Sequence, residues 1–380
     1  MRALVLGKGK SGEASAALLR SCGYDVDFAD GYDLVVASPG LPVKSELQLG
    51  CEELKRRGWK LLAVTGSKGK SSVVKIVAEA INLAGGHAVA CGNYGVPVSE
   101  VSLSSGASGS RSSRDARWAV VEVSSFMMET TTLPPDTFEA AAILNLQEDH
   151  LDRHGSVEVY HGLKRRLLTM AKLGFGPAVT GTDATLWHDS YFDNEILAGN
   201  AAMAVELMRV AGLDDAKIAA AFSRFEPLPH RMNFVAEFGG VRYVDDSKAT
   251  SLSALAAGVK MASSGNRTIP QSNKRTIRLI AGGLPKGDDP KSVLPTLTER
   301  VKKVYLIGQC AEVFRAAWEN GVDCEVCGTM DRAVERAVCE AENGETVLLS
   351  PGTASFDQFK SFGERGEVFA RLVKEKEKQK

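Results

Sequence analysis

Short apolar runs and longer helical periods alternate along most of the chain. Runs that read as buried strands occupy residues 2–6, 33–37, 60–64, 118–123, 140–144, 277–281, 303–307 and 345–349. Helical periods fill much of the intervening sequence, at 70–84, 156–171, 198–211, 251–262, 311–320 and 330–342. Strands that alternate with helices favour parallel sheets covered on both faces, so we expect an α/β fold.

The 380 residues are enough for two or three domains. We expect three α/β units, with one boundary near residue 59, before a glycine-rich loop, and another near residue 229, within the segment PLPHR. The predicted domains are therefore 1–59, which is short, 60–229 and 230–380.

Composition and charge exclude several classes of protein. With 46 basic and 47 acidic residues, the net charge of −1 argues against binding to nucleic acid or to a membrane surface. The seven scattered cysteines do not suggest a disulfide framework. The N-terminal apolar run is too short for a signal peptide, and no stretch is long enough to span a bilayer. We expect a cytoplasmic, monomeric protein.

The strongest local signal is an apolar strand that runs into a glycine-rich turn and then into a long helical period. The turn reads Gly66, Ser67, Lys68, Gly69, Lys70, Ser71, Ser72. Small residues let backbone N–H groups surround phosphate oxygens, and a helix N-terminus adds positive potential. Lys70 can then reach the phosphates and Ser71 can ligate Mg²⁺. Val64 stands where a Walker A pattern has glycine, and an ordinary strand–turn–helix is the alternative.

Two further segments offer groups that could hold a cation. Glu122 lies within the apolar run WAVVEVSSF, where a charge is costly unless it is paired or bound to metal. His150 follows a predicted buried strand, in the segment ILNLQEDHLDRHGS. Open α/β sheets place ligands at the ends of such strands. Taken alone, Glu122 could instead sit at an exposed strand end, and His150 could belong to a polar loop.

These motifs, in this order, resemble those of the Mur ligases. The similar segments are TGSKGKS (65–71), VEVSSF (121–126), NLQEDHLDRHGS (145–156), YHGLK (160–164), LPHRMN (228–233), DDSKATS (245–251), AGGLPKG (281–287) and SPGTASFDQFKSFGERG (350–366). The resemblance implies a short Rossmann-like N-terminal domain, a central P-loop NTPase-like domain with a mostly parallel sheet, and a Rossmann-like C-terminal domain.

The resemblance also implies an activity. ATP phosphorylates a carboxylate, and an amine displaces phosphate through a tetrahedral intermediate, in the synthesis of peptidoglycan precursors. The expected substrates are UDP-N-acetylmuramoyl-L-alanine and D-glutamate, and the expected cofactors are ATP and two Mg²⁺ ions. Lys164 is expected to be carbamylated, because an ammonium cannot bind a metal whereas an anionic carbamate can.

The residues that the resemblance assigns fall into five groups. The catalytic residues are Lys70, Glu122, His150 and Lys164, and the metal ligands are Ser71, Glu122, His150 and Lys164. ATP is assigned to Gly66, Ser67, Lys68, Gly69, Lys70, Ser71, Ser72, Asn194, Arg231 and Asp246. The UDP substrate is assigned to Lys10, Ser11, Ser38, Gly40, Asn93 and Ser124. The amino acid is assigned to Lys248, Thr250, Lys286, Ser355 and Phe362.

The chain departs from the family pattern in two places. The first domain lacks room for a helix and a strand after Phe28, and the central domain is trimmed between Lys172 and Ala198. In the trimmed segment DNEILAGN, either Asn194 or Asn200 can face the adenine.

Three alternatives remain open. The pattern Gly7-x-Gly9-x-x-Gly12, with Asp27 or Asp30 downstream, is also the fingerprint of a nicotinamide-dependent oxidoreductase. A second alternative is another ligase of the same superfamily, which adds alanine, a diamino acid or a folate glutamate. The third is a relic that binds nucleotide without turnover.

Overall fold

The computed structural model describes residues 1–30, 43–104, 116–148, 150–177, 181–194, 196–264, 276–285 and 287–379. These residues divide into two compact units. Unit 1 comprises Met1–Asp193 and Leu197–Phe225, and unit 2 comprises Asn194–Ile196 and Glu226–Lys380. The division into three domains remains a prediction.

Unit 1 is built on a five-stranded parallel sheet in the order β4-β5-β3-β6-β7. Its strands are β3 (Lys60–Thr65), β4 (His87–Gly92), β5 (Arg117–Glu122), β6 (Phe138–Ile143) and β7 (Ala171–Phe175). The central strand β3 is buried along nearly its whole length, since its sequence KLLAVT is almost entirely apolar. Parallel strands all end at the same edge, so the loops after β3, β5 and β6 meet there.

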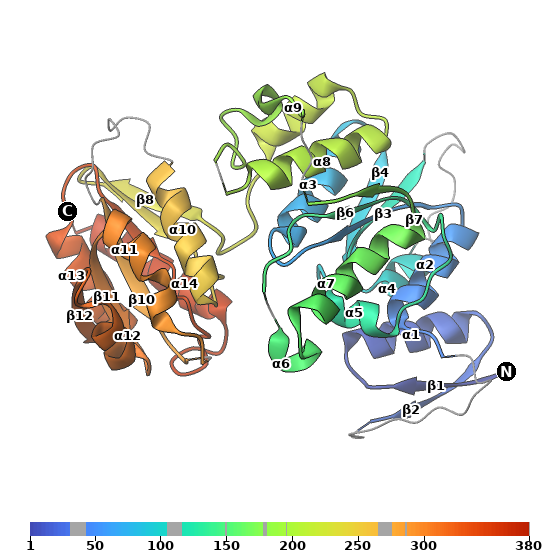
Figure 1. Cartoon of the computed structure of the whole chain (residues 1–380), viewed down its shortest axis with the longest axis horizontal. Coiled ribbons are helices and arrows are strands. Elements are labelled where there is room, and N and C mark those ends of the chain that lie inside the picture. The colour runs from blue at the N-terminus through green and yellow to red at the C-terminus, as the bar shows by residue number, and fades with distance from the viewer. Residues whose placement is uncertain are drawn as a thin grey trace. The chain divides into compact units, whose positions relative to one another are not determined.

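Helices cover both faces of this sheet (Figure 1). On one face lie α3 (Lys70–Leu83), α8 (Ala198–Val210) and α9 (Asp215–Arg224). The other face packs against α2 (Glu46–Arg56), α4 (Val98–Ser104), α5 (Ser125–Thr130), α7 (Val157–Arg166) and the 3₁₀ turn η1 (Leu167–Met170). The short α6 (Leu151–His154) precedes α7, and η2 (Ala184–Trp187) packs on α9.

The N-terminal segment forms a small layer of its own within unit 1. β1 (Arg2–Leu6) and β2 (Asp25–Ala29) pair in parallel as a two-stranded sheet, and α1 (Lys10–Ser21) connects them. Helix α1 also packs on α2 and α4. Gly12 is required here, because a Cβ at that position would lie 2.0 Å from the carbonyl oxygen of Gly7. The expected strand at 33–37 lies outside the described residues.

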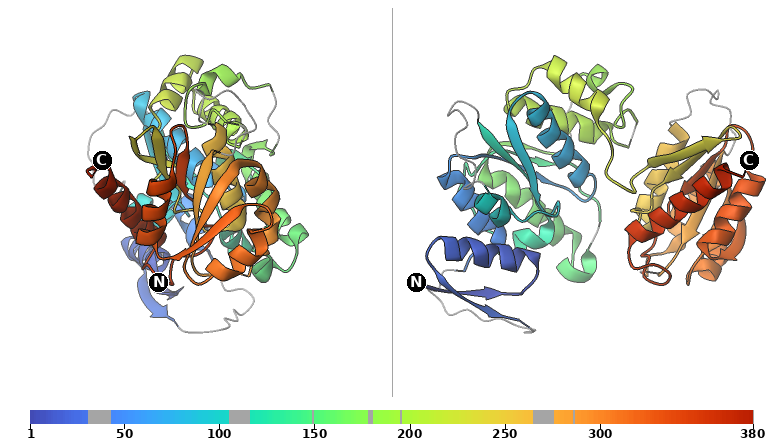
Figure 2. Two further views of the ribbon diagram at one scale, coloured as in Figure 1. Left: turned by 90° about the vertical axis from the view of Figure 1, so that its left-hand side faces the viewer. Right: turned by 180° about the vertical axis from the view of Figure 1, so that it is seen from behind.

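Unit 2 contains a six-stranded sheet in the order β12-β11-β10-β13-β9-β8, in which only the edge pair β8–β9 is antiparallel among the described strands. The strands are β8 (Asn233–Phe238), β9 (Val241–Asp245), β10 (Ile277–Gly282), β11 (Val301–Ile307), β12 (Asp323–Gly328) and β13 (Thr346–Leu349). Figure 2 shows the helices on the two faces of this sheet. One face packs against α10 (Leu252–Ser264), η3 (Pro290–Val293), α11 (Leu294–Arg300) and α12 (Ala311–Trp318), and the other against α13 (Met330–Glu340) and α14 (Phe362–Glu377).

The expected α/β class is confirmed, and so are the predicted strands and helices that fall within the described ranges. The apolar pattern missed edge strands such as β8 and β12, because one side of an edge strand carries polar residues. None of the helices that the structure describes has the length and apolar character needed to cross a membrane.

Candidate active site

The loop after β3 joins that strand to α3, which is the order of elements that the sequence predicted. Gly66 and Gly69 have φ values of +152° and +83°, which side-chain-bearing residues rarely adopt. A Cβ on Gly69 would lie 2.2 Å from Nδ2 of Asn200, so a larger residue would require the Asn200 side chain to move. The Lys70 ammonium donates to the carbonyl oxygens of Gly66 (2.8 Å) and Ser67 (3.1 Å), and folds over the loop.

A second loop, after β6, braces the glycine-rich loop. The amide of Asn145 bonds Lys68 twice, accepting from its backbone N–H (2.9 Å) and donating to its carbonyl (3.0 Å). The Ser67 hydroxyl donates to the backbone carbonyl of Gln147 (3.0 Å) and accepts from the backbone N–H of Gln147 (3.0 Å). The conformation of the glycine-rich loop is therefore fixed by side chains as well as by its own backbone.

Glu122 ends β5 beside the glycine-rich loop, with its Cα paired in register with Val64 of β3. Its side chain is buried, with 2% of the residue exposed. Oε1 accepts from Nδ2 of Asn93 (2.9 Å), whereas Oε2 has no hydrogen-bond partner among the residues that the structure describes. Oγ1 of Thr65, at the end of β3, is also buried and has no hydrogen-bond partner among the described residues. Sequence reasoning missed Thr65, because a threonine at a strand end gives no signal by itself.

Lys164 is buried on α7, with 1% of the residue exposed. Its ammonium donates to the Gly66 carbonyl (2.9 Å) and lies 4.6 Å from the ring centre of Tyr160. The Tyr160 hydroxyl in turn donates to Ser67 (3.1 Å). Without the family resemblance, the run Lys164-Arg165-Arg166 would be taken for a solvated helix face. That interpretation is wrong for Lys164, because α7 turns this residue toward the glycine-rich loop.

The two histidines just before α7, His150 and His154, differ in burial. His150 is exposed, has φ +54°, and lies 4.9 Å from Phe126 between ring centres. His154 is buried, and its Nε2 lies 3.0 Å from the Ser125 hydroxyl. Its Nδ1 lies 3.4 Å from Glu129. Sequence reasoning gave His154 no role, since its neighbours come from a distant segment.

The residues assigned to the UDP substrate, apart from Asn93, come from three segments of the chain. Lys10 donates to the carbonyl of Gly95, and Ser124 caps α5 by accepting from the N–H of Met127 (3.3 Å). Ser11 is exposed on α1. Ser38 and Gly40 lie outside the described residues.

Of the two asparagines left open for the adenine, Asn200 is buried on α8 and contacts Gly69. Asn194 precedes α8 and accepts from the N–H of Ile196 (3.2 Å). Asn200 therefore lies against the glycine-rich loop. The choice between Asn194 and Asn200 for the adenine stays open.

In unit 2, Asp246 follows β9 and is buried. The Ser350 hydroxyl donates to its Oδ2 (2.9 Å). Burial raises the pKa of Asp246 to about 7, and the Ser350 hydrogen bond and the Arg231 charge oppose this shift. Arg231 itself is half-buried, and its backbone N–H donates to Asn233 (2.8 Å).

Of the residues assigned to the amino acid, two are in contact at the start of α14. The Lys248 ammonium lies 3.8 Å from the ring centre of Phe362, which is the first residue of that helix. Ser355 is buried after β13, and Thr250 is half-buried after β9. Lys286 lies outside the described residues.

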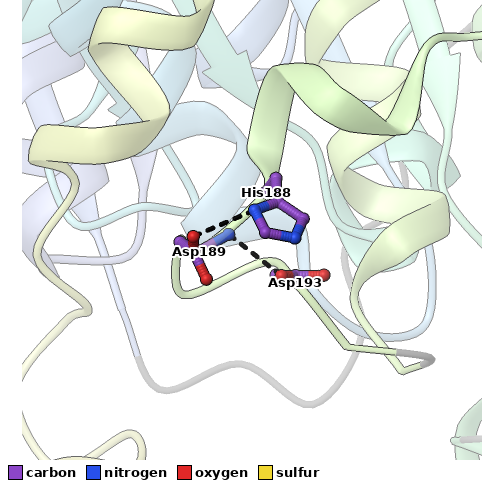
Figure 3. A group of neighbouring side chains, drawn as sticks. All are labelled: His188, Asp189 and Asp193. Atoms are coloured by element: carbon purple, nitrogen blue, oxygen red, sulfur yellow. Dashed lines mark hydrogen bonds and ion pairs between the residues drawn. The ribbon is translucent and has the colours of Figure 1, made fainter.

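A separate cluster of potential metal ligands lies in the trimmed segment before α8 (Figure 3). His188, Asp189 and Asp193 bring ligand atoms within 4.8 Å of one another. His188 already pairs with Asp189 (3.0 Å), and Asp193 accepts the N–H of Asp189 (2.9 Å). Exposed groups that satisfy each other in this way do not indicate a metal centre.

Comparisons with known proteins show the family to which the chain belongs. Residues 64–190 match the Mur ligase middle domain, and residues 230–352 match the Mur ligase glutamate ligase domain. The UDP-N-acetylmuramoylalanine–D-glutamate ligase of Nitratidesulfovibrio vulgaris strain DP4 is 35% identical over 356 residues, with 89% of this chain and 77% of that protein covered. The enzyme of that name from Acidobacterium capsulatum is 30% identical over 467 residues, with 98% and 96% covered. That match is longer than this chain, so the relative carries residues with no counterpart here.

Solved structures show the same fold. The MurF ligase of Thermotoga maritima in complex with ADP has a TM-score of 0.64 at 15% identity, with 100% of this chain and 95% of that chain covered. The UDP-N-acetylmuramate–alanine ligase of Thermotoga maritima has a TM-score of 0.60 at 14% identity, with 99% of both chains covered. The chain belongs to the Mur ligase family, a class of enzymes that form amide bonds.

Proposed function

We propose that this protein adds D-glutamate to UDP-N-acetylmuramoyl-L-alanine at the expense of ATP. The observation that carries the proposal is the pairing of the phosphate-binding loop with a buried carboxylate, Glu122, that has one unpartnered oxygen among the described residues. The names and identities of the curated relatives support the choice of substrates. The acid would be activated as an acyl-phosphate, and the amine would then displace phosphate through a tetrahedral intermediate.

The glycine-rich loop would hold the phosphates of ATP. The N-terminus of α3 offers backbone N–H groups and positive potential, which favour anions. Lys70 is now bonded to two loop carbonyls and can exchange these for phosphate oxygens. Such positioning and charge neutralisation account for most of the catalysis of phosphoryl transfer.

The donor set near the loop fits Mg²⁺. Magnesium prefers oxygen ligands, and Oε2 of Glu122 is a buried carboxylate oxygen without a partner among the described residues. Ser71, on the first turn of α3, would supply a hydroxyl. A bound Mg²⁺ would neutralise charge on the transferring phosphoryl group. The second ion is assigned to His150 and Lys164.

Lys164 would bind metal only after carbamylation, which turns its amine into an anionic oxygen donor. Its burial supports the assignment, since burial disfavours the charged ammonium and CO₂ reacts only with the neutral amine. The ammonium's present bond to Gly66 places the Lys164 side chain at the phosphate loop, where the proposed reaction takes place.

Unit 2 carries the other residues that the resemblance assigns to the substrates. Arg231 and Asp246 are assigned to the nucleotide, and Lys248, Thr250 and Ser355 to the amino acid. A dicarboxylic amino acid requires cations and hydroxyl groups, which these residues provide.

Mass spectrometry of the product tests the proposal. The purified protein, with ATP, Mg²⁺, UDP-N-acetylmuramoyl-L-alanine and D-glutamate, should yield the substrate extended by one glutamyl residue. Parallel reactions supply alanine or a diamino acid in place of D-glutamate, each with its matching UDP-muramoyl acceptor, and product formed only in one of these would assign the chain to another Mur activity. ATP binding without any product would favour the non-catalytic alternative.

A further inference from the structure

Three segments of unit 2 carry the four described residues that are assigned to the amino acid. Lys248 and Thr250 follow β9, Ser355 follows β13, and Phe362 begins α14. Because these segments are far apart in the sequence, a shared contact is needed to fix the distances between their side chains.

Arg365 makes that contact with all three segments. Its side chain lies on the first turn of α14 and is fully buried. Nε donates to the Ser247 hydroxyl (3.0 Å), and Nη2 donates to the carbonyls of Ser247 (2.9 Å) and Thr353 (3.2 Å). Nη1 donates to the carbonyl of Ala354 (3.3 Å). Ser247 and Ala354 directly precede Lys248 and Ser355 in the chain.

The Ser247 hydroxyl closes the network. It accepts from Arg365 and donates to the carbonyl of Phe362 (2.8 Å), on the same helix turn. A planar guanidinium presents several donors in fixed directions, which a flexible lysine cannot reproduce. The guanidinium of Arg365 therefore fixes the position of the loop after β9 relative to the loop after β13 and the start of α14.

The charge of Arg365 is satisfied by carbonyl and hydroxyl oxygens alone. Within the described ranges, no carboxylate lies within 4.0 Å of its nitrogens. Burial lowers its pKa to about 10, and the carboxylates of Asp357 and Asp245 oppose this shift from a greater distance. The side chain thus stays charged at neutral pH, in a place where a cation is costly.

We propose that Arg365 is a positioning residue that shapes the amino-acid pocket and so determines affinity for the incoming dicarboxylic amino acid. The inference rests on the proposed function, since it takes Lys248, Thr250, Ser355 and Phe362 as the pocket. Arg365 acts through these residues, because its own donors are already bonded to the protein.

Steady-state kinetics of three variants test this role, with D-glutamate and ATP varied separately. Arg365→Lys keeps the positive charge but loses the planar set of guanidinium donors. Arg365→Met loses both the charge and the donors. Arg371→Lys is the matched control, because Arg371 is exposed on the same helix and pairs with Glu375 (2.9 Å). We expect Arg365→Lys to raise KM for D-glutamate about 10-fold or more, because displaced Lys248 and Ser355 would bind the amino acid less tightly. KM for ATP and kcat should stay within about threefold, and Arg371→Lys should match the wild type.

An unchanged KM for D-glutamate in folded Arg365→Lys would overturn the inference, and so would equal losses for both substrates. If Arg365→Met does not fold, Arg365→Lys decides alone. A wild-type protein without D-glutamate-dependent turnover would contradict the proposed function instead. Calorimetric titration of D-glutamate into ADP-bound wild type and Arg365→Lys would then test Arg365 separately. Equal dissociation constants, or no binding to either protein, would overturn its role.

Discussion

The side-chain amide of Asn93 donates to one carboxylate oxygen of Glu122 over 2.9 Å and leaves the other oxygen buried without a partner among the described residues. Asn93 is brought there by Gly92, whose φ of +83° turns the chain at the end of β4. A Cβ on Gly92 would lie 2.4 Å from the Glu122 carbonyl oxygen. The pair thus fixes one oxygen of the carboxylate and leaves the other for a ligand.

Glu122→Gln should separate activity from stability. The amide keeps the shape but cannot neutralise a cation, so Mg²⁺-dependent turnover should fall about 100-fold or more. The free energy of unfolding without Mg²⁺ should stay equal or rise, because an unpartnered neutral group costs less than an unpartnered charge. Phosphate release and denaturant titration measure the two effects. Full turnover in Glu122→Gln would exclude the carboxylate as a metal ligand.

Gly69→Ala should weaken ATP binding by strain and by a clash. A left-handed φ costs an L-residue roughly 1–2 kcal/mol, and the new Cβ would meet Asn200. We expect ATP affinity to fall about 10-fold or more in calorimetric titration.

Gly85→Ala is the matched control for that prediction. Gly85 lies just past the end of the same helix with φ +90°, and a Cβ there would meet no described heavy atom within 4 Å. This variant should lose stability by about 1 kcal/mol and keep wild-type ATP affinity. Equal ATP affinities of Gly69→Ala and Gly85→Ala would count against the phosphate-binding role of the loop.

The apolar periodicity predicted most of the buried strands, because parallel strands such as β3 and β13 are nearly continuous apolar runs. The glycine-rich loop was also predictable, since its φ values require glycine at fixed spacing. The burial of Lys164 was not predictable from local sequence. Arg165 and Arg166 follow it directly on the same helix, and the tertiary contact with Gly66 distinguishes Lys164 from an exposed lysine.

Arg365 and His154 escaped prediction for a related reason. Their partners are mostly backbone carbonyls and residues from distant segments, which leave no spacing pattern in the sequence. Asn145 and Gln147 are similar, since they contact the glycine-rich loop from the loop that follows the neighbouring strand β6.

Lys164 should carry a carbamate when the protein is equilibrated with bicarbonate. Protein supplied with ¹³C-bicarbonate should give a carbamate carbon resonance that is absent from Lys164→Met. Turnover should fall in CO₂-depleted buffer and return when bicarbonate is added. A wild-type spectrum identical to that of Lys164→Met would refute the modification.

Asp246 should make unit 2 less stable as pH rises. Its pKa is about 7 in the folded chain and about 3.9 in an unfolded one, so the folded state binds more protons between these values. Its stabilising contribution is full below about pH 4 and is lost as pH rises toward about 7, with a slope of at most about 1.4 kcal/mol per pH unit.

Amide hydrogen exchange in β9 and β13, corrected for intrinsic rates, measures this dependence. Asp246→Asn should remove the slope and be more stable than the wild type above pH 7. A wild-type opening free energy that rises from pH 5 to pH 7, and falls in Asp246→Asn, would contradict the assignment.

Phosphate release tests the central claim most directly. The protein, with ATP, Mg²⁺ and UDP-N-acetylmuramoyl-L-alanine, is assayed with D-glutamate, with L-glutamate and with neither, beside Lys70→Ala and the control Lys75→Ala. Lys75 lies on the same helix and pairs with Glu79 (2.9 Å). We predict release that depends on D-glutamate, is lost in Lys70→Ala and persists in Lys75→Ala. Release that is independent of the amino acid, or that survives in Lys70→Ala, would contradict the account.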